Sequence, residues 1–209
     1  MTESSTYFTT IFPKIVKGTI LDFGFGQSPF IDNELSIINH LNYTGVDTDE
    51  FIVSQASDTW PETEFIHHDP TSNVFVPNEK FYDVAISYQS LTNCDINTFF
   101  TTIQFLYDKV KPGGYLLLNF LDQDDQPTVE HYQKLRIEEF GSCDDLSTPK
   151  WKYLIDNRIA YEKLNGKYFN LFLNKNFILK ELDSYNIQFR KSYHLIPNIF
   201  FSYMFIEKL

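Results

Sequence analysis

The sequence predicts an α/β protein built on a doubly wound, mainly parallel sheet. Short apolar segments alternate with segments of helical periodicity, which is the pattern of successive βαβ units. Glycine or an acidic residue follows several of the apolar segments, at the edge where sheets of this kind bind ligands. At 209 residues and 43% hydrophobic content, the chain can bury one sizeable core, so a single domain over residues 1–209 is expected.

The first three expected strands are short, and each ends at a glycine or an acid. They are residues 19–23 (TILDF), 43–47 (YTGVD) and 64–69 (EFIHHD). A helix is expected within residues 29–41, where apolar side chains keep to one helical face. A second, from about residue 50 to 57, stops before a proline.

The fourth strand, 82–88 (YDVAISY), leads into a helix that Asp95 can cap. The apolar side chains of this helix recur at helical spacing, at Phe99, Ile103, Leu106 and Val110. Such a stripe predicts a core-facing helix. Residues 111–114 (KPGG) are expected to break the chain before a fifth strand at 115–120 (YLLLNF).

A long insertion over residues 122–175 follows the fifth strand. Within it we expect a helix over 127–140 (PTVEHYQKLRIEEF), and over 151–164 (WKYLIDNRIAYEKL) a helix that is whole or broken near Asn157. Residues 167–173 (KYFNLFL) predict a strand.

The C-terminal part predicts one more helix and two closing strands. The helix covers 177–185 (FILKELDSY) and is expected to be capped by Asn176. The strands, 187–194 and 199–208, are expected to be joined by a turn at the intervening LIPN.

Charge and composition exclude several classes of protein. The formal net charge of −11 disfavours binding to nucleic acid or to an anionic membrane surface. The N-terminus lacks a secretory signal, and no apolar run is long enough to span a membrane. Cys94 and Cys143 form no metal-binding spacing, so reduced thiols and a cytoplasmic location are expected. His67 and His68 lie next to each other on a strand and point to opposite faces, so no metal site is predicted.

The turn at residues 20–30 (ILDFGFGQSPF) predicts a ligand close to the backbone. A dinucleotide cradle needs G-x-G-x-x-G, and Pro29 stands in the third glycine position after Gly24 and Gly26. A phosphate-binding P-loop needs a Lys followed by Ser or Thr, which is absent here. A nicotinamide oxidoreductase is therefore disfavoured, although the turn alone leaves it open.

Four motifs occur in order: D-x-G-x-G after the first strand, an acid ending the second, an acid ending the third, and KPGG before the fifth. With these motifs, the chain resembles the class I S-adenosylmethionine-dependent methyltransferases over about residues 15–121. The resemblance implies a seven-stranded, Rossmann-like sheet whose last strand is antiparallel. It also implies S-adenosyl-L-methionine as cofactor, S-adenosyl-L-homocysteine as product, and a lid-like insertion over residues 122–175 that helps to cover the substrate.

The resemblance also implies a cofactor site. The glycine turn and Gln27 would approach the methionine part, with Asp22 orienting the turn or reaching the amino group. Asp47 would accept both ribose hydroxyls, since a carboxylate offers two acceptors, and Thr48 would flank the adenine. Asp69 would accept a hydrogen bond from the adenine amino group. Asp47 as a helix cap and Asp22 as a turn residue are the structural alternatives.

Further residues follow from the same resemblance. The end of the fourth strand would face the methionine group and the substrate through Ser87, Tyr88 and Gln89, and Tyr7 could close over the cofactor. The chain departs from the family at Ser28, where many relatives carry a third glycine. It departs again at Pro70, which has no backbone N–H to offer the adenine ring.

The sequence is less specific about the residues that would bind the methyl acceptor. The aromatic insertion suggests Trp151, Tyr153 and Tyr161 as pocket residues, with ordinary packing or a dimer contact as alternatives. If a hydroxyl is methylated, His194 or His131 could act as general base. The acidic charge and aromatic content favour a small, partly apolar metabolite, and O- over N-methylation. A peptide or carrier-bound substrate, and a catalytically inactive binding or regulatory module, remain open.

Overall fold

The computed structural model of the chain describes residues 18–27, 42–70, 81–88, 90–122, 124–125, 127, 130, 151–154, 159–164, 167–198 and 201–209. The helix expected within 29–41 lies outside these residues, as does nearly all of the helix expected over 127–140. Within the described residues, no helix is both long and apolar enough to cross a bilayer.

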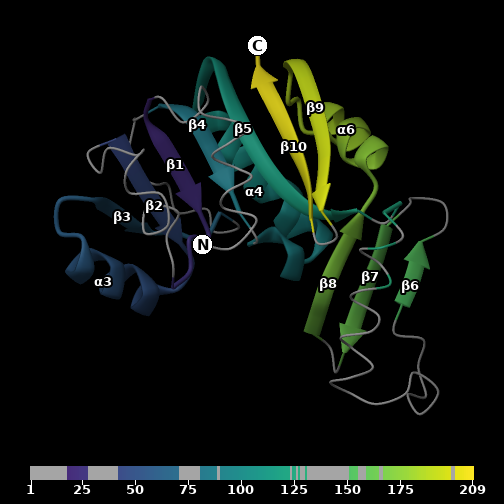
Figure 1. The fold of residues 1–209 in the computed structure, drawn as a ribbon, viewed down its shortest axis with the longest axis horizontal. Helices are drawn as coiled ribbons and strands as arrows, with labels where there is room; N and C mark the ends of the chain where they lie inside the picture. Colours follow the sequence, from purple (N-terminus) through teal and green to yellow (C-terminus); the bar gives the residue numbers. More distant parts are fainter. Residues whose placement is uncertain are drawn as a thin grey trace.

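Seven strands form the main sheet in the order β3-β2-β1-β4-β5-β10-β9 (Figure 1). They are β1 (Ile20–Phe23), β2 (Tyr43–Asp47), β3 (Glu64–His67), β4 (Tyr82–Ser87), β5 (Val110–Asp122), β9 (Phe189–Asn198) and β10 (Phe201–Lys208). The first five run parallel, and β10 lies antiparallel between β5 and β9. The predicted seven-stranded, mainly parallel sheet with an antiparallel last strand is therefore confirmed.

Three described α-helices begin at polar caps. Asp49 caps α3 (Glu50–Thr59), Asp95 caps α4 (Ile96–Lys109), and Asn174 caps α6 (Lys175–Ser184). Each side-chain oxygen accepts two of the N–H groups that the first helical turn leaves unpaired. Asp95 was predicted as a cap, whereas the prediction of Asn176 was wrong by two residues.

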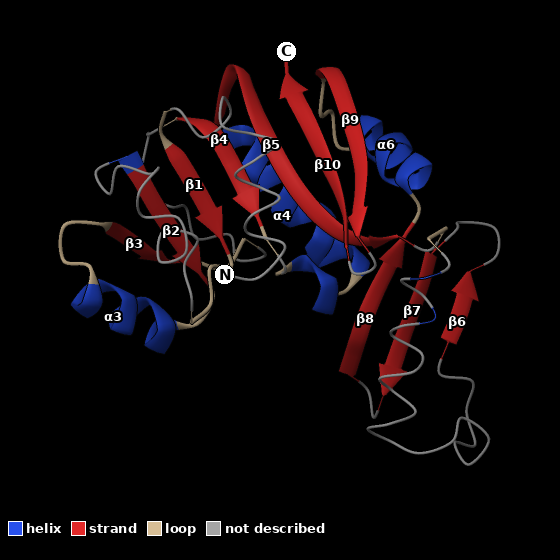
Figure 2. Cartoon of the chain, viewed as in Figure 1, coloured by secondary structure: helices blue, strands red, loops and turns tan. Residues whose placement is uncertain are grey.

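The helices cover both faces of the sheet (Figure 2). On one face, Phe23 and Val46 join a core with Ile178 of α6 and with the predicted stripe of α4 as far as Leu106, which is fully buried. Val110, predicted as the last residue of that helical stripe, is buried in the same core but begins β5. On the other face, Phe65 packs with Val53 of α3. Because successive strand residues point to opposite faces, this arrangement makes the sheet doubly wound, as predicted.

The KPGG segment does not separate α4 from the fifth strand. It lies within β5 as an irregularity, because β4 advances from Tyr82 to Val84 while β5 advances from Val110 to Tyr115. Gly114 permits this course, since a Cβ there would lie 2.7 Å from a β4 carbonyl oxygen. The LIPN segment likewise belongs to β9 and is not a turn.

Asp83 joins the beginnings of β1, β4 and β5. Its carboxylate accepts hydrogen bonds from Thr19 N (2.8 Å), Thr19 Oγ1 (2.9 Å) and Lys111 Nζ (2.8 Å). Burial tends to raise the pKa of Asp83, but these hydrogen bonds outweigh it and hold the pKa below its ordinary value. Asp83 is thus a structural residue at the edge opposite the glycine turn.

A second set of strands extends the sheet from the end of β5. Strands β6 (Trp151–Leu154), β7 (Ile159–Leu164) and β8 (Lys167–Leu173) pair antiparallel, and β8 pairs with the last two residues of β5. They project beyond the edge where the parallel strands end (Figure 1). The helix predicted over 151–164 is therefore wrong, while the strand predicted over 167–173 is confirmed.

Candidate functional site

The turn after β1 brings its backbone close to the loop that follows β4. Gly24 and Gly26 have φ of 71° and 61°, which glycine adopts without steric cost. The Gly24 N–H donates to Val46 O at 2.7 Å, and a Cβ at Gly24 would lie 2.2 Å from Ser90 Cβ. The turn is therefore held against both β2 and the β4 loop.

Asp47 ends β2 directly beside this turn. Its Oδ2 accepts the Gly26 N–H at 3.0 Å, and its Oδ1 accepts the Asp49 N–H at 3.0 Å. The residue is only 7% exposed. Each carboxylate oxygen has two acceptor sites, so each can accept one more hydrogen bond. The Asp47 carboxylate is thus held in place with one acceptor site left on each oxygen.

A cavity of about 270 Å³ opens where β1, β2 and β3 end. It is lined by Phe23, Gly24, Asp47, Thr48, Asp69, Pro70, Ser90, Leu91, Cys94, Thr98 and Thr102. Four of the predicted cofactor residues therefore meet at one cavity: Gly24, Asp47, Thr48 and Asp69.

One wall of this cavity was not predicted from the sequence. It consists of Ser90, Leu91, Cys94, Thr98 and Thr102, which come from the 3₁₀ turn η2 (Leu91–Asn93), its flanks and α4. Thr98 and Thr102 are spaced i, i+4 on α4, so they lie on one side of the helix axis, and Cys94 lies just before the helix. That row of small polar residues beside the apolar stripe was the available signal.

Ser87 connects to the glycine turn through Ser90. The two hydroxyl oxygens are 2.5 Å apart, and Ser90 Oγ donates to Phe23 O at 3.1 Å. Because Ser90 gives its proton to the carbonyl, Ser87 must donate to Ser90. Ser87 was predicted to contact the cofactor. Its hydroxyl instead donates to Ser90 and so helps to fix the loop that follows β4.

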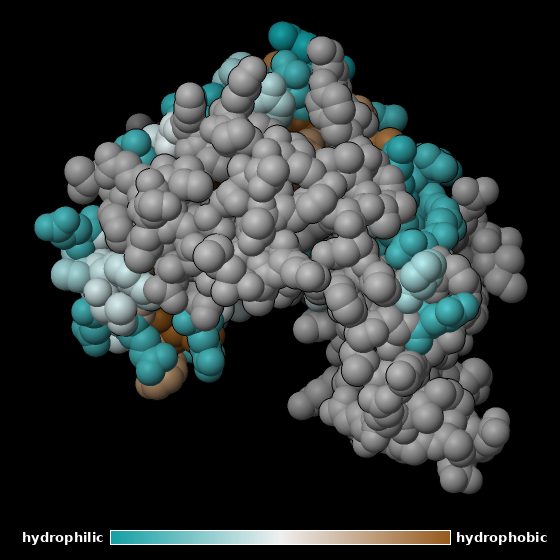
Figure 3. All heavy atoms as spheres, viewed as in Figure 1, coloured by the Kyte–Doolittle hydropathy of each residue, from teal (hydrophilic) through white to brown (hydrophobic). Residues whose placement is uncertain are grey.

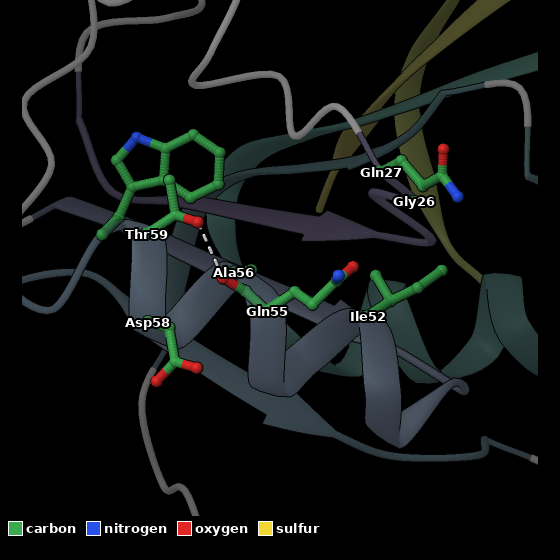
Figure 4. Close-up of a pocket in the computed structure, with 8 residues that line it drawn as sticks. Gly26, Gln27, Ile52, Gln55, Ala56, Asp58 and Thr59 are labelled. Atoms are coloured by element: carbon green, nitrogen blue, oxygen red, sulfur yellow. Dashed lines mark hydrogen bonds between the residues drawn. The ribbon is translucent and has the colours of Figure 1, made fainter.

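A second cavity, of about 380 Å³, lies between the glycine turn and α3 (Figure 4). Gly26 and Gln27 contribute from the turn, opposite Ile52 and Gln55 of the helix. The predicted residues thus divide between two cavities, and the Gly26 N–H bond to Asp47 links them.

Comparison with known proteins gives matches at the level of structure. No family model matches the sequence, and no curated protein is similar to it. An S-adenosylmethionine-dependent methyltransferase from Clostridium acetobutylicum ATCC 824 is similar over 98% of this chain and 89% of its own, at 10% identity and a TM-score of 0.61. The chain has the class I methyltransferase fold.

Two further solved structures share this fold. The 1,6-didemethyltoxoflavin-N1-methyltransferase of Burkholderia thailandensis, with bound S-adenosylhomocysteine, covers 98% of this chain and 76% of its own, at 12% identity and a TM-score of 0.62. Human N-acetylserotonin methyltransferase covers 99% of this chain but 52% of its own, at 15% identity and a TM-score of 0.66.

Asp22 lies on β1, two residues before the first glycine of the turn. It is 2% exposed, and its Oδ2 accepts the hydroxyl of Tyr43 at 2.6 Å. Tyr43, on β2, is itself 1% exposed. One side of the Asp22 carboxylate is therefore held within the sheet.

Burial controls the titratable groups near the cavity. It lowers the pKa of His68 below its ordinary value, outweighing the Asp69 carboxylate, which raises it. The His68 ring packs 4.9 Å from that of Phe105 on α4. Burial, supported by Asp95, also raises the pKa of the Cys94 thiol to about 12. Both groups are therefore held in their neutral forms.

The remaining predicted residues are described only in part. Tyr7, Gln89 and His131 lie outside the described residues. His194 lies on β9 opposite Met204 of β10, and Tyr88 directly follows β4. In the described part of the chain, no group of three or more His, Cys, Asp or Glu is arranged to hold a metal ion.

The three predicted aromatic residues of the insertion lie on β6 and β7. Tyr161 pairs with Lys152, whereas positions 151 and 153 alternate with it along β6. Since cross-strand partners share a face of the sheet, position 161 lies on the face opposite positions 151 and 153.

Proposed function

We propose that the protein is an S-adenosylmethionine-dependent methyltransferase acting on a small, partly apolar metabolite, with oxygen favoured over nitrogen as the accepting atom. The observation that carries the proposal is the geometry of Asp47. Its two oxygens are fixed by backbone N–H groups and border a cavity at the carboxyl edge of the sheet. A pair of vicinal ribose hydroxyls needs two such acceptors side by side.

The rest of the cavity fits the same ligand. The Gly24 turn has no side chain to block a close approach, and the Asp69 carboxylate offers a second acceptor site. Phe23, Leu91 and Cys94 supply apolar surface for a flat ring. These donors, acceptors and surfaces suit an adenosine group better than a pyrophosphate, because both charged side chains that line the cavity are anionic.

When bound, S-adenosylmethionine supplies a methyl group that its sulfonium makes electrophilic, for in-line displacement by the acceptor. The chain's part is then mainly to bind and align the two reactants, which alone can supply much of the rate acceleration. For a hydroxyl acceptor, His194 or His131 is the proposed general base. A carboxylate or a neutral amine needs no base.

We assign the acceptor side to the β6–β8 extension. The strand β8 packs against η2, whose Leu91 lines the cavity, so the extension begins next to the proposed cofactor site. Trp151 and Tyr153, or alternatively Tyr161, would then contact the acceptor. Two solved neighbours are, by name, methyltransferases of small molecules, 1,6-didemethyltoxoflavin and N-acetylserotonin. They support the small-metabolite class without separating oxygen from nitrogen.

Calorimetric titration with S-adenosylhomocysteine, with NAD as comparison, tests the cofactor assignment. Micromolar binding of S-adenosylhomocysteine with none of NAD supports the proposal, and the reverse result favours an oxidoreductase. Release of S-adenosylhomocysteine is then measured with S-adenosylmethionine and a panel of phenols, carboxylic acids, amines and short peptides. Binding without turnover on any member of the panel would favour an inactive binding module.

A further inference from the structure

We propose that the Thr102 hydroxyl is the hydrogen-bond donor with which the cavity recognises a ring nitrogen of its ligand's heteroaromatic base. The inference rests on the proposed function, under which that base is adenine. It assigns base specificity to a residue of α4 that none of the four sequence motifs contains.

Thr102 is fully buried, and its Oγ1 has no hydrogen-bond partner within the described structure. A helical threonine can normally donate to the carbonyl one turn back. On α3, Ser57 and Thr59 do so, donating to Val53 O at 2.9 Å and to Gln55 O at 2.8 Å. An unsatisfied buried hydroxyl is costly, so the missing bond at Thr102 calls for a partner from outside the helix.

The other side-chain donors around the cavity are already committed or exposed to water. Three of them donate within the protein: Ser90 to Phe23 O, Cys94 to Leu91 O, and Thr98 to the Asp95 carboxylate. Thr48 is exposed. Among the described lining residues, Thr102 is therefore the one buried side-chain donor that is left for a ligand.

The cavity also needs such a donor. Its charged lining groups, Asp47 and Asp69, are acceptors, and Pro70 contributes no backbone N–H. Adenine carries a donating amino group and accepting ring nitrogens, so acceptors alone would satisfy only half of its polar edge. A change of χ1 rotamer can move the hydroxyl of a threonine into the place that its methyl held, which lets Thr102 direct either group at the ring.

The test is Thr102→Val, which keeps the shape and removes the hydroxyl. Affinity for S-adenosylhomocysteine, measured by calorimetry, should fall about fivefold to tenfold. The melting temperature of the ligand-free protein should stay the same or rise, because an unsatisfied polar group has been removed. Thr102→Ser should retain most of the affinity.

Thr44→Val is the matched control. Thr44 is also fully buried, but its hydroxyl donates to Glu64 Oε2 at 2.9 Å and it does not line the cavity. This variant should lower the melting temperature and leave the affinity unchanged. Thr102→Val should therefore weaken binding without loss of stability, and Thr44→Val should lower stability without loss of binding.

Deaza analogues of S-adenosylhomocysteine, each lacking one ring nitrogen, identify the accepting atom. For one analogue the wild type should lose affinity and Thr102→Val should lose no more. If Thr102→Val melts earlier and binds S-adenosylhomocysteine as the wild type does, the hydroxyl is structural and the inference is wrong. If the wild type itself does not bind S-adenosylhomocysteine, the proposed function fails, and the inference fails with it.

Discussion

Replacing Asp47 by alanine removes both acceptors proposed to hold the ribose. Each oxygen now accepts one backbone N–H at 3.0 Å and has one site left for a hydroxyl. A hydrogen bond to a charged group contributes roughly 1.5–3 kcal/mol, so losing two weakens binding by at least about 3 kcal/mol. That loss corresponds to more than about a hundredfold in Kd.

Calorimetric titration with S-adenosylhomocysteine measures this loss. Asp47→Asn keeps one acceptor oxygen and should lose about tenfold or more. Asp49→Asn is the matched control, with the same change of charge two residues away. Asp49 caps α3 through the N–H groups of Phe51 and Ile52, and asparagine caps as well as aspartate, so its affinity and melting temperature should match the wild type.

Circular dichroism must show that each variant is folded, because the Gly26 and Asp49 N–H groups lose their partner in Asp47→Ala. A folded Asp47→Ala protein that binds S-adenosylhomocysteine with wild-type affinity would refute the assignment of Asp47. An equal loss in Asp49→Asn would show that the effect comes from general charge and not from the two acceptors.

Three further predictions concern the turn, a thiol and an ion pair. Gly24→Ala should destabilise the protein by at least about 3 kcal/mol in urea melts, because a left-handed φ and a serine side chain both oppose a Cβ. Gly26→Ala, with nothing within 4 Å, should cost only about 1 kcal/mol. The Cys94 thiol is measured alone in a Cys143→Ser protein. Because its pKa is about 12, native Cys94 should react with Ellman's reagent at pH 8 at least about a thousandfold more slowly than it does after unfolding. The pKa of Asp83 is lower in the folded protein than in the unfolded chain. The ionised carboxylate therefore stabilises the folded state fully above the unfolded-state pKa near 4, and this stabilisation is lost as the pH falls through the folded-state pKa. Asp83→Asn should therefore cost no more than about 1 kcal/mol at pH 7, since its pair with Lys111 is 40–42% exposed and screened. The difference from the wild type should disappear once the pH falls below the folded-state pKa of Asp83.

The main sheet could be predicted because its elements are locally specified. Apolar runs of strand length, the stripe on α4 and the cap at Asp95 agree with one another, and parallel neighbours then follow from the βαβ pattern. The cap of α6 shows the limit of this agreement. Asn174 and Asn176 are the same residue type two positions apart, and only the hydrogen bonds to the N–H groups of Asn176 and Phe177 decide between them.

Residues 151–164 were predicted as helix, although each of their strands pairs with a strand that is its neighbour in sequence. The pairing of β7 with β8 runs from Ile159 opposite Leu173 to Leu164 opposite Lys167. A segment this short with apolar residues at mixed spacing fits both periods, and tertiary pairing decides between them. In the order β5-β8-β7-β6, only the pairing of β8 with β5 joins segments that are distant in sequence, and local patterns do not predict it.

The candidate site likewise contains residues that could be predicted from the sequence and residues that could not. Gly24, Asp47 and Asp69 could be predicted because each lies at or just after the end of a recognisable strand. Ser90 and Thr102 could not, since their role depends on how α4 packs under the ends of β1 and β2. The hydroxyl of Ser90 meets a carbonyl 67 positions earlier in the chain, a contact that no motif encodes.

The surface over α6 and much of that around α3 is hydrophilic (Figure 3).

The β6–β8 extension pairs with the main sheet at the end of β5. Along most of its length β5 pairs with β10, from Tyr115 opposite Glu207 to Phe120 opposite Ser202, and only Leu121 and Asp122 pair with β8. The hydrogen bonding of the main sheet is therefore nearly complete without the extension. Mutations, insertions and deletions in β6 and β7 can accumulate without disturbing the glycine turn or Asp47, whereas β8 is constrained because Leu171 and Leu173 belong to the core of the main sheet. A lineage could change what this extension contacts while it inherits the other half of the site intact.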